Sequence, residues 1–120
     1  MPGVHVICAF KDEAFAKGGF AALKQTSYLV TSAESEEEIE RDFSRESYQV
    51  VVIGPGFDQP AKARIATKAW ENGCAVVVVC SSKDDQKIAA DEHVELKASD
   101  LKLVPAVLKA VTAKFYAVAV

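Results

Sequence analysis

The sequence has few cysteines and no long apolar run. Its 120 residues include 3 cysteines, an odd number without paired spacing, which argues against a disulfide framework and favours a reducing compartment. No apolar run approaches the ~20 residues that a membrane-spanning helix requires. The N-terminus lacks the basic segment and the cleavage-type sequence of a secretory signal. We therefore expect a cytoplasmic protein without a membrane span.

An excess of positive charge is also missing. The formal net charge is −3, which argues against a dedicated nucleic-acid binder, because phosphate contacts need clustered lysine and arginine. Hydrophobic residues make up 50% of the chain, too many for a disordered protein. A length of 120 residues suits one core rather than two, so we expect a single domain over residues 1–120.

Apolar runs alternate with amphipathic segments along the chain. Three runs are almost unbroken in their apolarity, as is typical of parallel strands covered on both faces: residues 4–10, 50–53 and 75–80. Two weaker candidates, 28–31 and 93–96, mix polar and apolar positions, which suits edge strands. The pattern predicts a three-layer, doubly wound α/β fold with five parallel strands in the order 2-1-3-4-5, as in flavodoxins.

Helix signals occupy the segments between these strands. Gly18 and Gly19 interrupt the first helix, and Ser35 with Glu38 matches a capping box at the start of the second. Pro60 suits the first turn of a third helix, and residues 82–90 predict a short fourth helix. The inner face of the third helix is predicted to hold Ile65, Ala66, Ala69 and Trp70.

The last helix has the clearest periodicity. Its inner face is predicted to consist of five residues spaced alternately by three and four: Leu101, Val104, Leu108, Val111 and Phe115. Pro105 lies inside this pattern, so the helix either begins there or is bent. The apolar segment 115–120 either folds back on the core or extends a sheet edge in a homodimer.

Three features of the sequence resemble a response-regulator receiver domain. They are this strand order, the unbroken spacing from Tyr28 through Ser35 to the third strand, and Lys97 after the fifth strand. In that family an acidic pair after the first strand holds Mg²⁺, and an aspartate at the end of the third accepts a phosphoryl group. A hydroxyl at the end of the fourth strand and a lysine at the end of the fifth contact that group.

The chain departs from the family pattern at most of these positions. The resemblance puts Gly54 at the phosphoacceptor position, Cys80 followed by Ser81 at the hydroxyl position, and Lys97 at the lysine position. Asp12 and Glu13 come one or two residues later than the family's acidic pair. The resemblance therefore implies a degenerate pseudo-receiver without catalytic residues, metal or cofactor. Such a module would bind a protein partner through its fourth helix, fifth strand and fifth helix.

Three remnants of the family pocket each allow two interpretations. Asp12 and Glu13 either hold a divalent cation or stabilise a helix N-terminus, and we favour the latter. Asp58 either replaces the missing acceptor or caps the third helix, and again we favour the cap. Lys97 either binds an anion near Gly54 or is a solvated lysine, and both interpretations stay open at this point.

Two other functions compete with the interaction module. Cys8 lies where phosphocysteine carriers and small tyrosine phosphatases place their nucleophile, but two acids and no arginine follow it. We therefore favour a buried structural thiol and no enzymatic activity. Flavin or small-anion binding is the other alternative, although Pro55 removes an N–H donor beside Gly54. His5 and His93 lie on strands that the predicted order separates, so they form no metal site or catalytic dyad.

Overall fold

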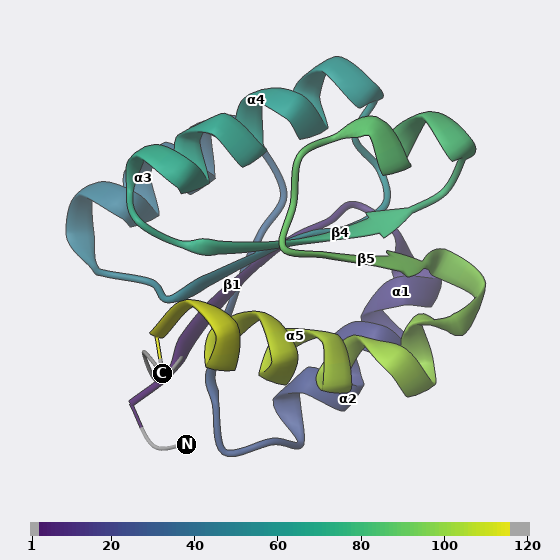
Figure 1. Cartoon of the computed structure of the whole chain (residues 1–120), viewed down its shortest axis with the longest axis horizontal. Helices are drawn as coiled ribbons and strands as arrows, with labels where there is room; N and C mark the ends of the chain where they lie inside the picture. Colours follow the sequence, from purple (N-terminus) through teal and green to yellow (C-terminus); the bar gives the residue numbers. More distant parts are fainter. Residues whose placement is uncertain (1–2, 116–120) are drawn as a thin grey trace.

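A computed structural model describes residues 3–115 (Figure 1). Its five parallel strands form one sheet in the order β2-β1-β3-β4-β5, which confirms the predicted α/β architecture. The strands are β1 (His5–Ala9), β2 (Leu29–Ala33), β3 (Val50–Ile53), β4 (Ala75–Cys80) and β5 (Glu92–Glu95). Every residue of β3 and β4 is buried, as their unbroken apolar sequences predict.

Helices cover both faces of the sheet (Figure 1). One face carries α1 (Glu13–Lys17), α2 (Gly19–Lys24) and α5 (Ser99–Phe115), and its core includes Phe15, Leu23, Leu103 and Val107. The other face carries α3 (Glu36–Arg45) and α4 (Gln59–Glu71), which bury Ile39, Ile65 and Ala69. Two short 3₁₀ segments, η1 (Lys83–Lys87) and η2 (Leu96–Ala98), flank β5. The predicted short fourth helix over 82–90 is therefore wrong, since this connection forms only η1.

Three polar side chains start helices at the carboxyl edge of the sheet. Asp12 accepts the Phe15 N–H at 2.8 Å and caps α1, and Ser35 accepts the Glu38 N–H at 3.1 Å and caps α3. Asp58 accepts the Ala61 N–H at 2.9 Å and caps α4, with Pro60 in the first turn. Such caps satisfy backbone donors that have no partner within their helix. The sequence predicted Ser35 and Asp58 as helix caps and placed Asp12 at a helix N-terminus.

The break between α1 and α2 falls at Gly18, as the glycine pair predicts. The carboxylate of Asp100, in the first turn of α5, lies where a side chain on Gly18 would have to go. A residue without a Cβ lets α5 pack closely beside α2.

The last helix turns a different face to the sheet from the one predicted. Its buried residues are Leu103, Ala106, Val107, Ala110 and Val111. The prediction was wrong for Leu101, Leu108 and Phe115, which are 84%, 45% and 42% exposed. Two apolar stripes lie side by side on this helix, and the stripe containing two alanines faces the sheet. The helix begins at Ser99, so it does not start at Pro105.

The prediction was also wrong for Trp70, which is 37% exposed and lies beneath the ammonium of Lys114, 4.8 Å from the ring centroid. The apolar tail was expected to fold back or pair, but residues 116–120 lie outside the described part of the chain. Within residues 3–115 no helix is long and apolar enough to cross a membrane.

Candidate functional site at the carboxyl edge of the sheet

Gly54 is buried directly after β3, at the position that the sequence resemblance assigns to the phosphoacceptor. Its N–H donates to the carbonyl of Ala9 at 2.7 Å. A Cβ on Gly54 would lie 2.9 Å from Cβ of Phe10 and 3.0 Å from the Ala9 oxygen. These are contacts with a Cβ and a backbone atom, neither of which can rotate away. The position therefore has no carboxylate and no space for one.

Phe10, where the sequence resemblance puts the family's acidic pair, belongs to a cluster of aromatic rings at the end of β1. The ring centroid of Phe10 lies 5.2 Å from that of Phe15 and 4.7 Å from that of Phe20. Phe15 is buried and the other two rings are half-buried against the same core. A cluster of this kind is stabilised by burial and by ring contacts. It offers no oxygen ligand to a cation.

The three acidic candidates do not converge. Asp12 and Asp58 each cap a different helix. The carboxylate of Glu13 is 87% exposed and pairs with Lys17 at 3.7 Å. Among residues 3–115 no group of three acidic, histidine or cysteine side chains is placed to hold a metal ion. The favoured interpretation of the acids as helix-end residues agrees with this geometry.

A buried ion pair lies beside the end of β4, and neither partner was singled out from the sequence. The Nζ of Lys62 on α4 donates to Asp85 Oδ2 at 2.9 Å and to the carbonyl of Val79 at 3.1 Å. It also approaches Ser81 Oγ at 3.4 Å. Lys62 and Asp85 are only 1% and 4% exposed. The three contacts use all three protons of the ammonium.

Asp85 is held in its charged form by this network. Burial would raise its pKa, but hydrogen bonds from Lys62 and from the backbone N–H groups of Ser81 and Ser82 outweigh burial and lower the pKa below its usual value. The Ser81 N–H reaches Asp85 Oδ2 at 2.9 Å. A buried ion pair stabilises a fold only when its remaining hydrogen-bonding capacity is also satisfied. Here both the lysine and the carboxylate meet that condition.

Sequence spacing contained a signal for Lys62. It falls three residues before Ile65 and four before Ala66, on the face of α4 that the periodicity assigns to the core. A lysine at such a position needs a buried acidic partner. Asp84 and Asp85 both lie in the next connection, and only the structure distinguishes the buried Asp85 from the exposed Asp84.

Lys97 is not directed at Gly54. It belongs to η2 rather than to the end of β5, its side chain is 85% exposed, and its Nζ lies 3.6 Å from Glu95. Together with the buried Cys80 and the exposed Ser81, it lines an open cleft of about 540 Å³. The geometry favours the solvated lysine over an anion ligand at Gly54.

The cysteines are buried and their thiols are held protonated. Burial raises the pKa of Cys8, which is 0% exposed, and raises that of Cys74 to about 11. Burial, followed by the charge of Asp85, raises the pKa of Cys80. A nucleophilic cysteine needs the opposite shift. His5 and His93 lie on β1 and β5, which β3 and β4 separate as predicted.

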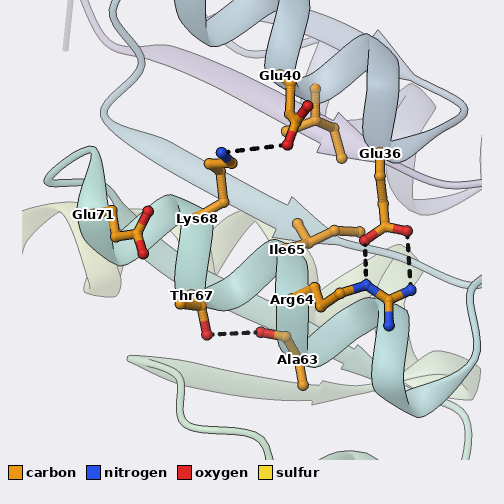
Figure 2. Close-up of a pocket in the computed structure, with 9 residues that line it drawn as sticks. Glu36, Glu40, Ala63, Arg64, Ile65, Thr67, Lys68 and Glu71 are labelled. Atoms are coloured by element: carbon orange, nitrogen blue, oxygen red, sulfur yellow. Dashed lines mark hydrogen bonds and ion pairs between the residues drawn. The ribbon is translucent and has the colours of Figure 1, made fainter.

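A second hollow, between α3 and α4, is crossed by surface ion pairs (Figure 2). Arg64 makes a bidentate contact with Glu36 at 2.8 and 3.0 Å, and Lys68 pairs with Glu40 at 3.3 Å. The hydrogen bond from Arg64 lowers the pKa of Glu36. These partly exposed pairs hold α3 against α4, and they contribute little energy compared with a buried pair.

Comparison with known proteins supports the architecture through structure and not through sequence. No family model and no curated protein matches the sequence. A receiver domain protein from Methanospirillum hungatei matches with a TM-score of 0.76 and 13% identity, over 92% of this chain and 95% of that one. The chain has the fold of a response-regulator receiver domain.

Two further solved structures share this receiver fold over almost their whole lengths. The signal receiver domain of a histidine kinase from Syntrophus aciditrophicus matches with a TM-score of 0.74 and 15% identity, over 98% of this chain and 97% of that one. A response regulator from Thermotoga maritima matches with a TM-score of 0.71 and 17% identity, over 91% and 98%. In this receiver fold, Gly54 directly follows the third strand, where the sequence resemblance puts the phosphoacceptor.

Proposed function

We propose that this chain is a pseudo-receiver, a protein-interaction module in signalling that works without phosphorylation at the family position. The closed space at Gly54 carries the proposal. A phosphorylated receiver needs a carboxylate oxygen there to attack the phosphorus atom. Glycine supplies none, and Phe10 and the Ala9 carbonyl leave no room for a larger residue.

The placement of the acidic side chains is a second support. Mg²⁺ prefers several oxygen ligands in near-octahedral geometry. Asp12 and Asp58 instead accept backbone N–H groups at two different helix ends, and Glu13 points to solvent beside Lys17. Moving Asp12 or Asp58 onto a metal ion would leave the first turn of α1 or α4 without its cap, at a cost of about 1 kcal/mol.

The end of β4 supplies the third support. In the family, a hydroxyl at this point contacts the phosphoryl group. Here the N–H of Ser81 donates to Asp85, and its hydroxyl lies beside the ammonium of Lys62. The chain's own charges therefore fix this strand end and η1, and the surface around β5 keeps one arrangement. The partner is a protein, the site of action is the cytosol, and Cys8 performs no catalysis.

The test is an amide NMR titration of the full chain with beryllofluoride and Mg²⁺, alongside a receiver that keeps its acidic residues. The reference protein should show large shifts around its phosphoacceptor. This chain should show no such shifts, because Gly54 has no carboxylate to bind beryllofluoride. Large shifts at Gly54, Ser81 and Lys97 would overturn the proposal.

Iodoacetamide labelling addresses the competing cysteine chemistry. Burial raises the pKa of Cys8, so we expect no labelling of the folded chain at neutral pH and full labelling after unfolding. Rapid modification of Cys8 in the folded protein would favour the phosphocysteine or phosphatase alternative.

A further inference from the structure

The outward side of α5 carries a row of large apolar residues that the rest of the described chain leaves largely or partly exposed. Leu101, Leu108 and Phe115 are 84%, 45% and 42% exposed. Successive members are seven residues apart, close to two helical turns, so they lie on one side of the helix. Val104 lies between the first two and is half-buried against the core. We call these four residues the α5 stripe.

Apart from Val104, the residues of the α5 stripe do not belong to the core beside the sheet. That core contains the neighbouring stripe, which includes Leu103, Val107 and Ala110, all nearly inaccessible to solvent. Single exposed leucines are common on protein surfaces, and Leu29 on β2 is one. A row with a repeat of seven is different, because this spacing forms the seam between paired helices.

The charge around the α5 stripe indicates the kind of helix that fits it. The helices on this face of the sheet carry five lysines and two acids: Lys17, Lys24, Lys102, Lys109, Lys114, Glu13 and Asp100. Their net charge is thus positive, although the whole chain has a net charge of −3. Lys102 and Lys109 directly follow Leu101 and Leu108 and both are exposed, although Lys109 also pairs with Glu92 of β5 at 3.7 Å.

A second copy of this chain is a poor occupant of this surface. A two-fold axis would bring the same lysine-bearing helices together, and like charges across an interface are unfavourable. An acidic helix would gain both apolar burial along the stripe and attraction from the lysines. Charge complementarity therefore selects a different protein over self-association.

We propose that the α5 stripe is the docking site for an amphipathic helix of a partner protein, with heptad-spaced apolar residues and acidic flanks. This proposal deepens the proposed function by naming the chemistry of the partner. It narrows the contact to the outward side of α5, whereas family analogy points to a wider surface of the fourth helix, fifth strand and fifth helix.

The probe is a synthetic peptide of about three heptads, with leucine at both seam positions and glutamate on the flanks. Glutamate flanks repel one another, which disfavours pairing of the free peptide with itself. We expect the full chain to bind this peptide with amide shifts along α5, and to bind it more weakly as salt increases. A peptide with the same seam and lysine flanks should bind at least about tenfold more weakly.

Variants of the full chain assign the contact. Leu101→Ala with Leu108→Ala should weaken binding by about tenfold or more, because it removes exposed apolar area. Leu29→Ala is the matched control and should bind like the unchanged protein. The midpoint of thermal unfolding should be nearly the same for the double variant, the control variant and the unchanged protein. All three substituted leucines, Leu29, Leu101 and Leu108, are exposed.

Three outcomes would overturn this inference: equal binding of the two peptides, unchanged binding by the double variant, or a dimer in sedimentation that the double variant abolishes. None of these depends on the beryllofluoride experiment. Failure of the docking surface and failure of the pseudo-receiver proposal are therefore distinguishable.

Discussion

At the ends of β1 and β3 the carboxyl edge of the sheet is filled by phenylalanine rings, whereas at the end of β4 it is filled by a lysine and an aspartate. In the first region, Phe10 closes the space beside Gly54 and packs against Phe15 and Phe20. In the second region, Lys62 and Asp85 are almost completely buried and satisfy each other together with Ser81.

Under the proposed function, the two regions act against phosphoryl chemistry by opposite means. Apolar packing removes the acceptor and the cation ligands near β1 and β3. Near β4, polar groups are present, but each is bonded inside the protein. A pocket that binds an anion needs donors without partners, and in the described part of the chain no buried side-chain nitrogen or oxygen of either region is left without a partner.

The largest expected effect comes from removing the cation of the buried pair. Lys62→Met leaves the Asp85 carboxylate buried beside apolar atoms, which should reduce the free energy of unfolding by about 3–5 kcal/mol. Urea unfolding measures this loss. Combining Lys62→Met with Asp85→Leu should recover most of it, because no unpaired charge then remains.

Lys68→Met is the matched control on the same helix. Lys68 pairs with Glu40 at the surface, so this change should cost less than about 1 kcal/mol. Equal losses for the two lysine variants would show that the buried pair has no special role.

The aromatic region should respond to an added methyl group. Gly54→Ala places a Cβ 2.9 Å from Cβ of Phe10, and overpacking of this kind costs about 1–3 kcal/mol. Chemical denaturation measures the loss, with Ser47→Ala at an exposed position as the control. A Gly54→Ala variant as stable as the unchanged protein would mean that the space is open.

Acid should act on the β4 region through the buried carboxylate of Asp85. The folded pKa of Asp85 lies below its unfolded value of about 3.9. Its contribution is therefore complete above the unfolded pKa and is lost as pH falls through the folded pKa. Unfolding measured between about pH 6 and pH 2 should show a smaller acid loss for Asp85→Asn than for the unchanged chain. Identical profiles would contradict this assignment.

The smallest effect is expected at the groove between α3 and α4 (Figure 2). Arg64→Ala removes the bidentate contact with Glu36, yet both partners are partly exposed, so the loss should stay below about 1 kcal/mol and decrease further in salt. A loss as large as that of Lys62→Met would remove the distinction between buried and exposed pairs in this protein.

Most of the fold could be predicted from the periodicity of apolar residues. At the site, the sequence predicted only which family residues are missing, above all the aspartate at position 54. Unbroken valine runs identified β3 and β4, and the caps Ser35 and Asp58 were recognisable because their chemistry is local. The face of α5 was wrongly predicted, because periodicity alone does not decide which of two apolar stripes meets the sheet.

The packing of Phe10 against Gly54 and the buried ion pair were not predicted from the sequence, for a related reason. Each joins residues from separate elements: Phe10 with Gly54, and Lys62 with Asp85. Sequence spacing assigns residues to faces of helices and strands, but contacts across the sheet edge depend on tertiary packing.

The central proposal is that this protein works without accepting a phosphoryl group from a small acyl phosphate. Intact-mass measurement of the full chain after incubation with acetyl phosphate and Mg²⁺ tests it most directly, because it detects an acceptor anywhere in the sequence. We expect the mass of this protein to stay unchanged under conditions that phosphorylate a receiver with its acidic residues intact. A stoichiometric gain of one phosphoryl group, on Asp12, Asp58 or any other residue, would contradict it.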